Sequence, residues 1–113
     1  MNDSFLRFYV PEGDRHGHVP LWEWLLEHGN KLGVRGGSAS RAMACFGRDH
    51  TLNEQRFFEL AGTLTIEVEF IASDLEAQQL LALVGNEKLR LFYARIPAQF
   101  GVSNPDATDA AAP

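Results

Sequence analysis

The order of the predicted elements indicates an α+β fold in which strands and helices follow one another as β-α-β-β-α-β. Two observations carry most of this prediction. Residues 64–70 alternate between apolar and polar side chains, the pattern of a strand with one buried and one solvent-facing side. Ser73 and Glu76 have the spacing of a capping box, in which each side chain accepts the backbone N–H of the other residue, so a helix is expected to begin there.

The first half of the chain supplies a strand, a helix and a second strand. Residues 5–10 are aromatic and β-branched and lead into Pro11, which predicts a first strand that ends in a loop. Pro20 suits the first turn of a helix, and the leucines that follow predict a helix over 21–32. The small residues of 38–46 predict a second strand on which a helix can pack closely.

The second half supplies a strand, a helix and a last strand. The helix that begins after Ser73 is expected to end at Gly85-Asn86, because glycine and asparagine are common just past helix ends. Residues 88–96 alternate again and predict the last strand. This is the ferredoxin-like order, in which right-handed crossovers place both helices on one face of a four-stranded antiparallel sheet.

The other face of that sheet is predicted to lack any cover from the chain's own helices. Its expected residues mix apolar and charged side chains: Phe5 or Tyr9, Arg7, Arg41, Met43, Glu67, Glu69, Phe92 and Ile96. A mixed face of this kind indicates burial by a partner subunit. A sheet face that is simply solvated is the alternative.

Length, charge and composition limit the class of protein. The 113 residues suit one domain, which we expect over 1–102, followed by a disordered tail over 103–113 that has little apolar content beyond alanine. Ten Lys and Arg against fifteen Asp and Glu give a net charge of −5, which argues against nucleic acid as a partner. No apolar run is long enough to cross a bilayer and no signal peptide is recognised, so a cytoplasmic protein without membrane insertion is expected.

The connection between the second and third strands is unusually long. A hairpin needs about two to five residues, whereas here residues 47–63 intervene. Residues 51–54 could cap a short helix, or residues 56–60 could extend the third strand outwards. Loops of this length in a compact domain are usually functional or mobile.

Three runs of sequence resemble a known family. They are VPEGDRHGHVPLWEWLLEHG, RAMACFGRDHT and RFFELAGTLTIEVEF, and the resemblance extends over 5–96. The chain resembles the small PII-like proteins, a conserved family of unknown function related to the nitrogen regulatory PII proteins. The most specific residues are Asp14-Arg15, Gly17, Pro20-Leu21, Phe46-Gly47-Arg48 and His50-Thr51. Cys45 stands where the family pattern has glycine, and residues 52–55 look like a small insertion.

The resemblance implies a homotrimer of ferredoxin-like subunits, whose uncovered sheet faces line the interior. It also implies clefts between subunits that hold an adenine nucleotide, AMP, ADP or ATP. Some members of the family are encoded beside, or fused to, predicted fluoride exporters, which implies a membrane transporter or another regulated protein as partner. The tyrosine that is uridylylated in PII proteins has no clear counterpart, so that modification is not expected.

Gly47 and Arg48 are the sharpest candidates for binding an anion. A glycine lets backbone N–H groups approach a phosphate, and an adjacent guanidinium can hold its oxygens. Gly85, Lys88 and Arg90 form a second set of a glycine and cations after the second helix. In the related trimers two such loops, from neighbouring subunits, face one cleft. The alternative is that the glycines serve only turns and the cations are solvated.

These residues lead to a first hypothesis and an alternative. The first is a PII-like signalling protein in which ligand binding orders the 47–63 loop, which then engages or releases a partner protein. The alternative is a structural or metal-binding trimer resembling the divalent-cation tolerance proteins, with His16, His18 and His50 as candidate ligands without strict spacing. An enzyme is not expected, because the sequence lacks a Walker A motif and the glycine-rich loop of the acylphosphatases that share this fold.

Overall fold

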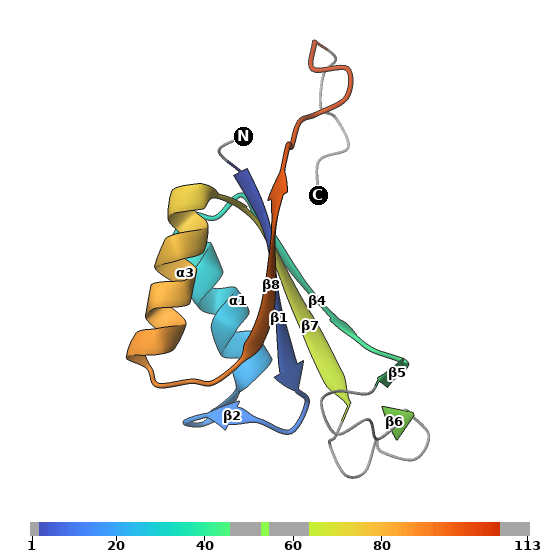
Figure 1. Cartoon of the computed structure of the whole chain (residues 1–113), viewed down its shortest axis with the longest axis vertical. Helices are drawn as coiled ribbons and strands as arrows, with labels where there is room; N and C mark the ends of the chain where they lie inside the picture. The colour runs from blue at the N-terminus through green and yellow to red at the C-terminus, as the bar shows by residue number, and fades with distance from the viewer. Residues whose placement is uncertain (1–2, 46–52, 55–63, 107–113) are drawn as a thin grey trace.

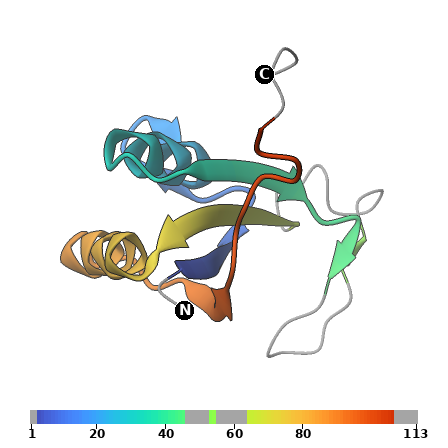
Figure 2. The ribbon, with the colours of Figure 1, turned by 90° about the horizontal axis from the view of Figure 1, so that it is seen from above.

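The computed structural model describes residues 3–45, 53–54 and 64–106, and their central feature is a four-stranded sheet of order β4-β7-β1-β8 (Figure 1). Every neighbouring pair in this sheet is antiparallel. The strands are β1 (Asp3–Pro11), β4 (Gly36–Arg41), β7 (Thr65–Ser73) and β8 (Phe92–Ala98). Two helices, α1 (Leu21–Lys31) and α3 (Asp74–Asn86), form one layer on one side of the sheet (Figure 2). The predicted α+β ferredoxin-like fold is confirmed.

Strict alternation along the two central strands builds the core. In β1 and β7 every second side chain is buried under the helices, including Phe8, Val68 and Phe70. The helices contribute their own buried residues to the same layer: Leu21, Trp24, Leu25, Ala77, Leu80 and Val84. Burial of each large apolar side chain contributes about 1.5–3 kcal/mol, so this single layer accounts for most of the drive to fold.

The last strand begins later than its alternation suggested. Residues 88–91 precede β8 as a turn that closes α3, since the N–H groups of Lys88 and Leu89 donate to the carbonyls of Gly85 and Val84 at 3.0 and 3.1 Å. Leu89 and Leu91 then pack against the core. The prediction of strand from residue 88 was therefore wrong, because alternating leucines serve the end of a helix equally well.

The second predicted strand is divided in two. The main strand β4 ends at Arg41, and a separate short pair, β5 (Ala44–Cys45) with β6 (Asn53–Glu54), follows it in the chain. Asn53 and Glu54 thus pair as a strand and do not open a helix. The suggested extension of the third strand over 56–60 lies outside the described residues, as does most of the 47–63 connection.

The face of the sheet away from the helices carries both Phe5 and Tyr9, together with Arg7, Glu67, Glu69, Phe92 and Ile96 as predicted. Two predicted members are misplaced. Arg41 is the last residue of β4 and lies opposite Ile66, a core residue, so it belongs to the helix side, where it pairs with Glu12. Met43 lies beyond the end of β4. We call the remaining surface the open sheet face.

Beyond β8 the chain leaves the sheet, and residues 101–106 are exposed. Residues 107–113, most of the predicted disordered tail, lie outside the described residues, so disorder over 103–113 stays a prediction. None of the helices in the described ranges is long and apolar enough to span a membrane.

Candidate functional site

The candidate residues that the structure describes gather at one end of the sheet (Figure 1). At this end β1 and β4 finish, and β7 and β8 begin. The hairpin of β2 (Arg15–His16) and β3 (Val19–Pro20), the turn after α3 and the β5–β6 pair all lie here. We call this the loop end of the sheet.

The turn between α3 and β8 presents two cations to solvent. Lys88 has a φ of 58°, a left-handed conformation that costs a non-glycine residue about 1–2 kcal/mol. Lys88 and Arg90 are both exposed, and neither forms an ion pair with another described residue. Gly85 lies one residue before the end of α3, where an added Cβ would meet no atom within 4 Å. Lys88 and Arg90 are therefore available to a ligand. Close packing is not the reason for glycine at position 85.

The hairpin is fixed to this turn by His16. Its Nε2 lies 2.8 Å from Glu87 Oε1, and its ring stacks on the indole of Trp24 with centroids 4.5 Å apart. A second histidine, His28, also contacts this indole. The two ring centroids lie 4.2 Å apart, and His28 Nδ1 lies 2.9 Å from the backbone carbonyl oxygen of Trp24. His16 thus links hairpin, α1 and the α3–β8 turn, and positions the backbone next to Lys88.

The proposed metal ligands do not converge in the described part of the chain. His16 is engaged with Glu87, and residues 3–45, 53–54 and 64–106 contain no group of three or more His, Cys, Asp or Glu side chains that could hold an ion. His50 lies outside the described residues.

The two predicted anion-binding sets adjoin different edge strands in the sequence. Gly47 and Arg48 lie outside the described residues, and in the chain they follow β5, which comes after the edge strand β4. Lys88 and Arg90 precede β8, the other edge strand, and β7 and β1 lie between the two.

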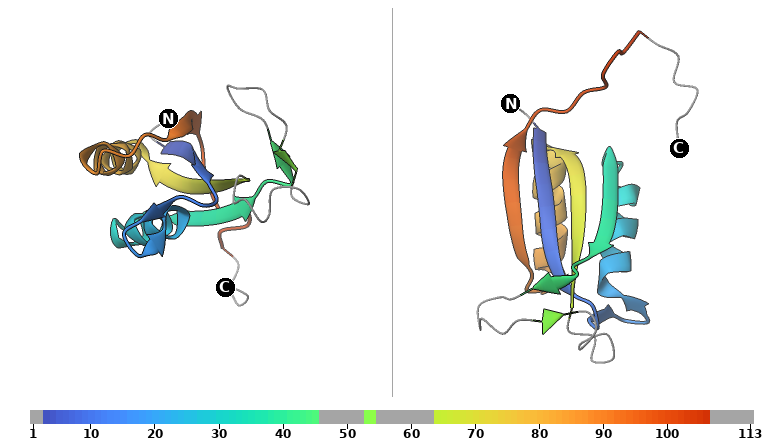
Figure 3. Two further views of the ribbon diagram at one scale, coloured as in Figure 1. Left: turned by 90° about the horizontal axis from the view of Figure 1, so that it is seen from below. Right: turned by 90° about the vertical axis from the view of Figure 1, so that its right-hand side faces the viewer.

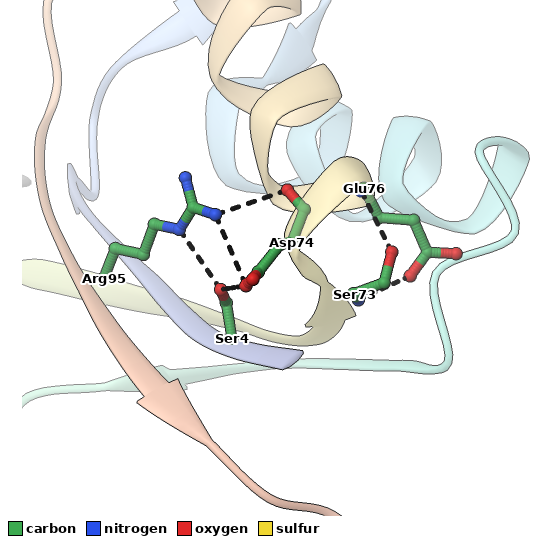
Figure 4. Close-up of polar contacts among 5 residues, drawn as sticks. All are labelled: Ser4, Ser73, Asp74, Glu76 and Arg95. Atoms are coloured by element: carbon green, nitrogen blue, oxygen red, sulfur yellow. Dashed lines mark hydrogen bonds and ion pairs between the residues drawn. The ribbon is translucent and has the colours of Figure 1, made fainter. Parts of the chain in front are cut away.

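A polar cluster that was not predicted from the sequence joins three elements at the other end of the sheet (Figure 4). The hydroxyl of buried Ser4 donates to Asp74 Oδ1 at 2.6 Å and accepts from Arg95 Nε at 3.1 Å. The hydrogen bond from Ser4, assisted by Arg95, lowers the pKa of Asp74 below its usual value. These contacts tie β1, β8 and the start of α3 together.

The capping box predicted beside this cluster is confirmed. The Ser73 N–H donates to Glu76 Oε1 at 2.8 Å, and the Glu76 N–H donates to Ser73 Oγ at 3.1 Å (Figure 4).

A second polar group lies at the centre of the open sheet face. The Arg7 guanidinium donates to Glu69 at 2.8 Å and lies 3.9 Å from Glu67. Hydrogen bonds to Tyr9 and Glu69 raise the pKa of Arg7 above its already high ordinary value, so the side chain stays charged. This cross-strand group pairs the Arg7 charge within the sheet, with apolar side chains on both sides of it.

Residues 4–88 match the family described as "Uncharacterized ACR, COG1993", DUF190. The chain belongs to the DUF190 family. This is a PII-like family of unknown function, and the resemblance derived from the sequence is confirmed. The chain is also similar to a "UPF0166 protein" of Aquifex aeolicus (strain VF5), at 26% identity over 78 residues, which is 69% of this chain and 74% of that protein. The matched segment of the DUF190 protein contains the hairpin, α1, α3 and Lys88, and it ends before β8.

Proposed function

We propose that this DUF190 protein is a PII-like regulator that assembles as a homotrimer, binds an adenine nucleotide between subunits and controls a partner protein through residues 47–63. The observation that carries the proposal is the open sheet face. Phe92 is 70% exposed and Ile96 54% exposed on it, although both belong to a regular strand. Apolar side chains in a sheet are normally covered, so a second layer from neighbouring subunits is expected.

Assembly through this face would bring different sheet edges together. The cations of the α3–β8 turn lie at one edge, and the chain that leads to Gly47 and Arg48 leaves from the other. A cleft between subunits could therefore hold an anion between Lys88 and Arg90 of one subunit and Arg48 of the next. The phosphates of AMP, ADP or ATP suit such a set, because guanidinium and ammonium groups make strong charged hydrogen bonds to them.

Isothermal titration with AMP, ADP and ATP tests the ligand. Each charged hydrogen bond contributes about 1.5–3 kcal/mol, so Arg48→Ala, Lys88→Ala and Arg90→Ala should each weaken binding about ten- to hundredfold. Lys31→Ala is the matched control, since Lys31 is also exposed and makes no ion pair among the described residues, but belongs to the last turn of α1. Unchanged affinity in all three variants, or no binding by the wild type, would contradict the nucleotide site.

The same titration with copper and zinc distinguishes nucleotide binding from the alternative function, metal binding. Metal binding without nucleotide binding would favour a metal-binding trimer, in which His16 would have to leave Glu87.

Control of a partner, a membrane transporter or another regulated protein, would act through residues 47–63. Their amide exchange should slow when the nucleotide is added, because a segment that is ordered by ligand protects its N–H groups. Equal exchange with and without the bound nucleotide would count against this role.

A further inference from the structure

Apolar side chains occupy every second position of β8 and continue past its end. The series is Phe92, Ala94, Ile96, Ala98, Phe100 and Val102. Its first four members lie on the open sheet face, where they face away from the helices. Alternation of this kind is typical of a strand with one buried side. The pattern therefore predicts a longer buried surface than the sheet of one subunit provides.

The chain's own sheet does not reach the last members of the series. The register of β8 ends with Ala98 opposite Asp3. The next four residues, Gln99–Val102, which we call the C-terminal arm, leave the sheet at the end opposite to the loop end and extend away from it (Figures 1 and 3). Val102 is 74% exposed. An extended chain advances about 3.3 Å per residue, so Val102 lies about 13 Å beyond Ala98 if the arm stays extended.

An apolar row lies on the open sheet face near the base of the arm, with Ile96 exposed and Phe5 and Ile71 half-buried. Phe5 lies opposite both Ile71 and Ile96, so these three side chains form one row across β7, β1 and β8. At the β4 end of the row stands Gly36, opposite Ile71, which adds no side chain. The neighbouring row is charged, with Arg7 between Glu69 and Ala94. An apolar segment would therefore bind at the first row and not at the second.

We propose that the C-terminal arm of one subunit packs on a second copy of this chain, with Phe100 and Val102 against the neighbour's apolar row of Ile71, Phe5 and Ile96. The arm carries no charge, which matches an uncharged row. It cannot cover its own row without reversing direction, since Ile96 lies only four residues before Phe100 on the same strand path. The inference rests on the proposed trimer and specifies the contact that holds neighbouring subunits together.

Sedimentation over a dilution series tests the arm. Phe100→Ser combined with Val102→Ser should raise the concentration at which the assembly dissociates about tenfold or more, because two apolar side chains lose their cover. Leu75→Ser is the matched control, since Leu75 is 64% exposed on α3, in the helix layer, and should leave the assembly unchanged. A chain that ends at Ala98 should behave like the double variant.

Chemical cross-linking locates the contact. In a Cys45→Ser background, Ile96→Cys with Val102→Cys should form disulfides between chains, whereas Leu75→Cys with Val102→Cys should not. A wild-type protein that is monomeric at every concentration would overturn the trimer and the arm contact together. A wild-type trimer whose dissociation is unchanged by the arm variants, with no disulfides between positions 96 and 102, would overturn the arm contact alone.

Discussion

At the scale of single residues, Gly29 in α1 is the position where packing most clearly requires glycine. A Cβ at this position would lie 2.3 Å from Cε1 of Phe70 and 3.0 Å from two further atoms of that ring. Phe70 is only 1% exposed in the core of the protein, so its ring has little room to move aside. The glycine therefore sets how closely α1 approaches β7.

Gly29→Ala should lower the free energy of unfolding by about 1–3 kcal/mol, the usual cost of overpacking a core. Gly85→Ala is the matched control, because it is also a helical glycine but an added Cβ there meets no atom within 4 Å. That control should be neutral or gain up to about 1 kcal/mol, since alanine is the better helix former. Urea unfolding measures both, and equal loss in the two variants would contradict the packing argument.

Single residues also show how far the sequence could predict the candidate site. The cations Lys88 and Arg90 were predicted beside each other near a helix end, and the structure places them in one exposed turn. The side of Arg41 was not predictable, because the strand around it, GGSASR, carries small residues on both faces and no alternation to set its register. The contact between His16 and Glu87 spans 71 residues and has no local signal.

At the scale of elements, local patterns predicted which elements exist better than where they end. Alternation and the capping box correctly predicted β7 and the start of α3. Residues 88–91 also alternate, but there the leucines cover the end of α3, and pairing in β8 begins only at Phe92. A strand boundary depends on where its neighbour offers backbone groups, and the sequence of one strand does not contain that information.

The cluster of Ser4, Asp74 and Arg95 makes the junction of β1, β8 and α3 sensitive to pH. The folded state lowers the pKa of Asp74 below its ordinary value of 3.8. The carboxylate therefore contributes stability that is fully present above the pKa of the unfolded state and is lost as the pH falls through the pKa of the folded state. Asp74→Asn should therefore be less stable than the wild type at pH 7, and this difference should shrink as the pH falls below about 4.

Urea unfolding between pH 7 and pH 3 measures that difference. Ser4→Ala removes the hydrogen bond that contributes most to the lowered pKa of Asp74. In a Ser4→Ala background, the difference in unfolding free energy between proteins with and without Asp74→Asn should therefore depend less on pH. A difference between wild type and Asp74→Asn that stays constant over this range would show that the charge of Asp74 adds nothing to the junction.

At the scale of the whole molecule, the two sides of the sheet differ in what covers them. The helix side holds a complete core, with Leu6, Phe8 and Val10 fully buried on β1. On the open side, the same strand presents Phe5, Arg7 and Tyr9 half-buried, and the edge strand β8 presents Phe92 and Ile96 exposed. Arg7 is already paired with Glu69, and the exposed apolar side chains of β8 are the feature of this side that a partner would cover.

Phe92→Glu should therefore dissociate the proposed trimer while leaving the subunit folded. The Phe92 ring lies 5.5 Å from that of Tyr9 and is otherwise largely exposed, so its loss costs the isolated subunit little. In an assembly, a carboxylate at position 92 would be buried without a partner, and desolvation opposes its burial. Glu67 lies on the other side of Tyr9 in the same row, so repulsion between like charges opposes it as well. Sedimentation should give a species near 12.6 kDa, with unchanged circular dichroism. Leu75→Glu, on the helix layer, should keep the mass of the wild type, and a Phe92→Glu protein that kept it too would show that the open sheet face is not where subunits meet.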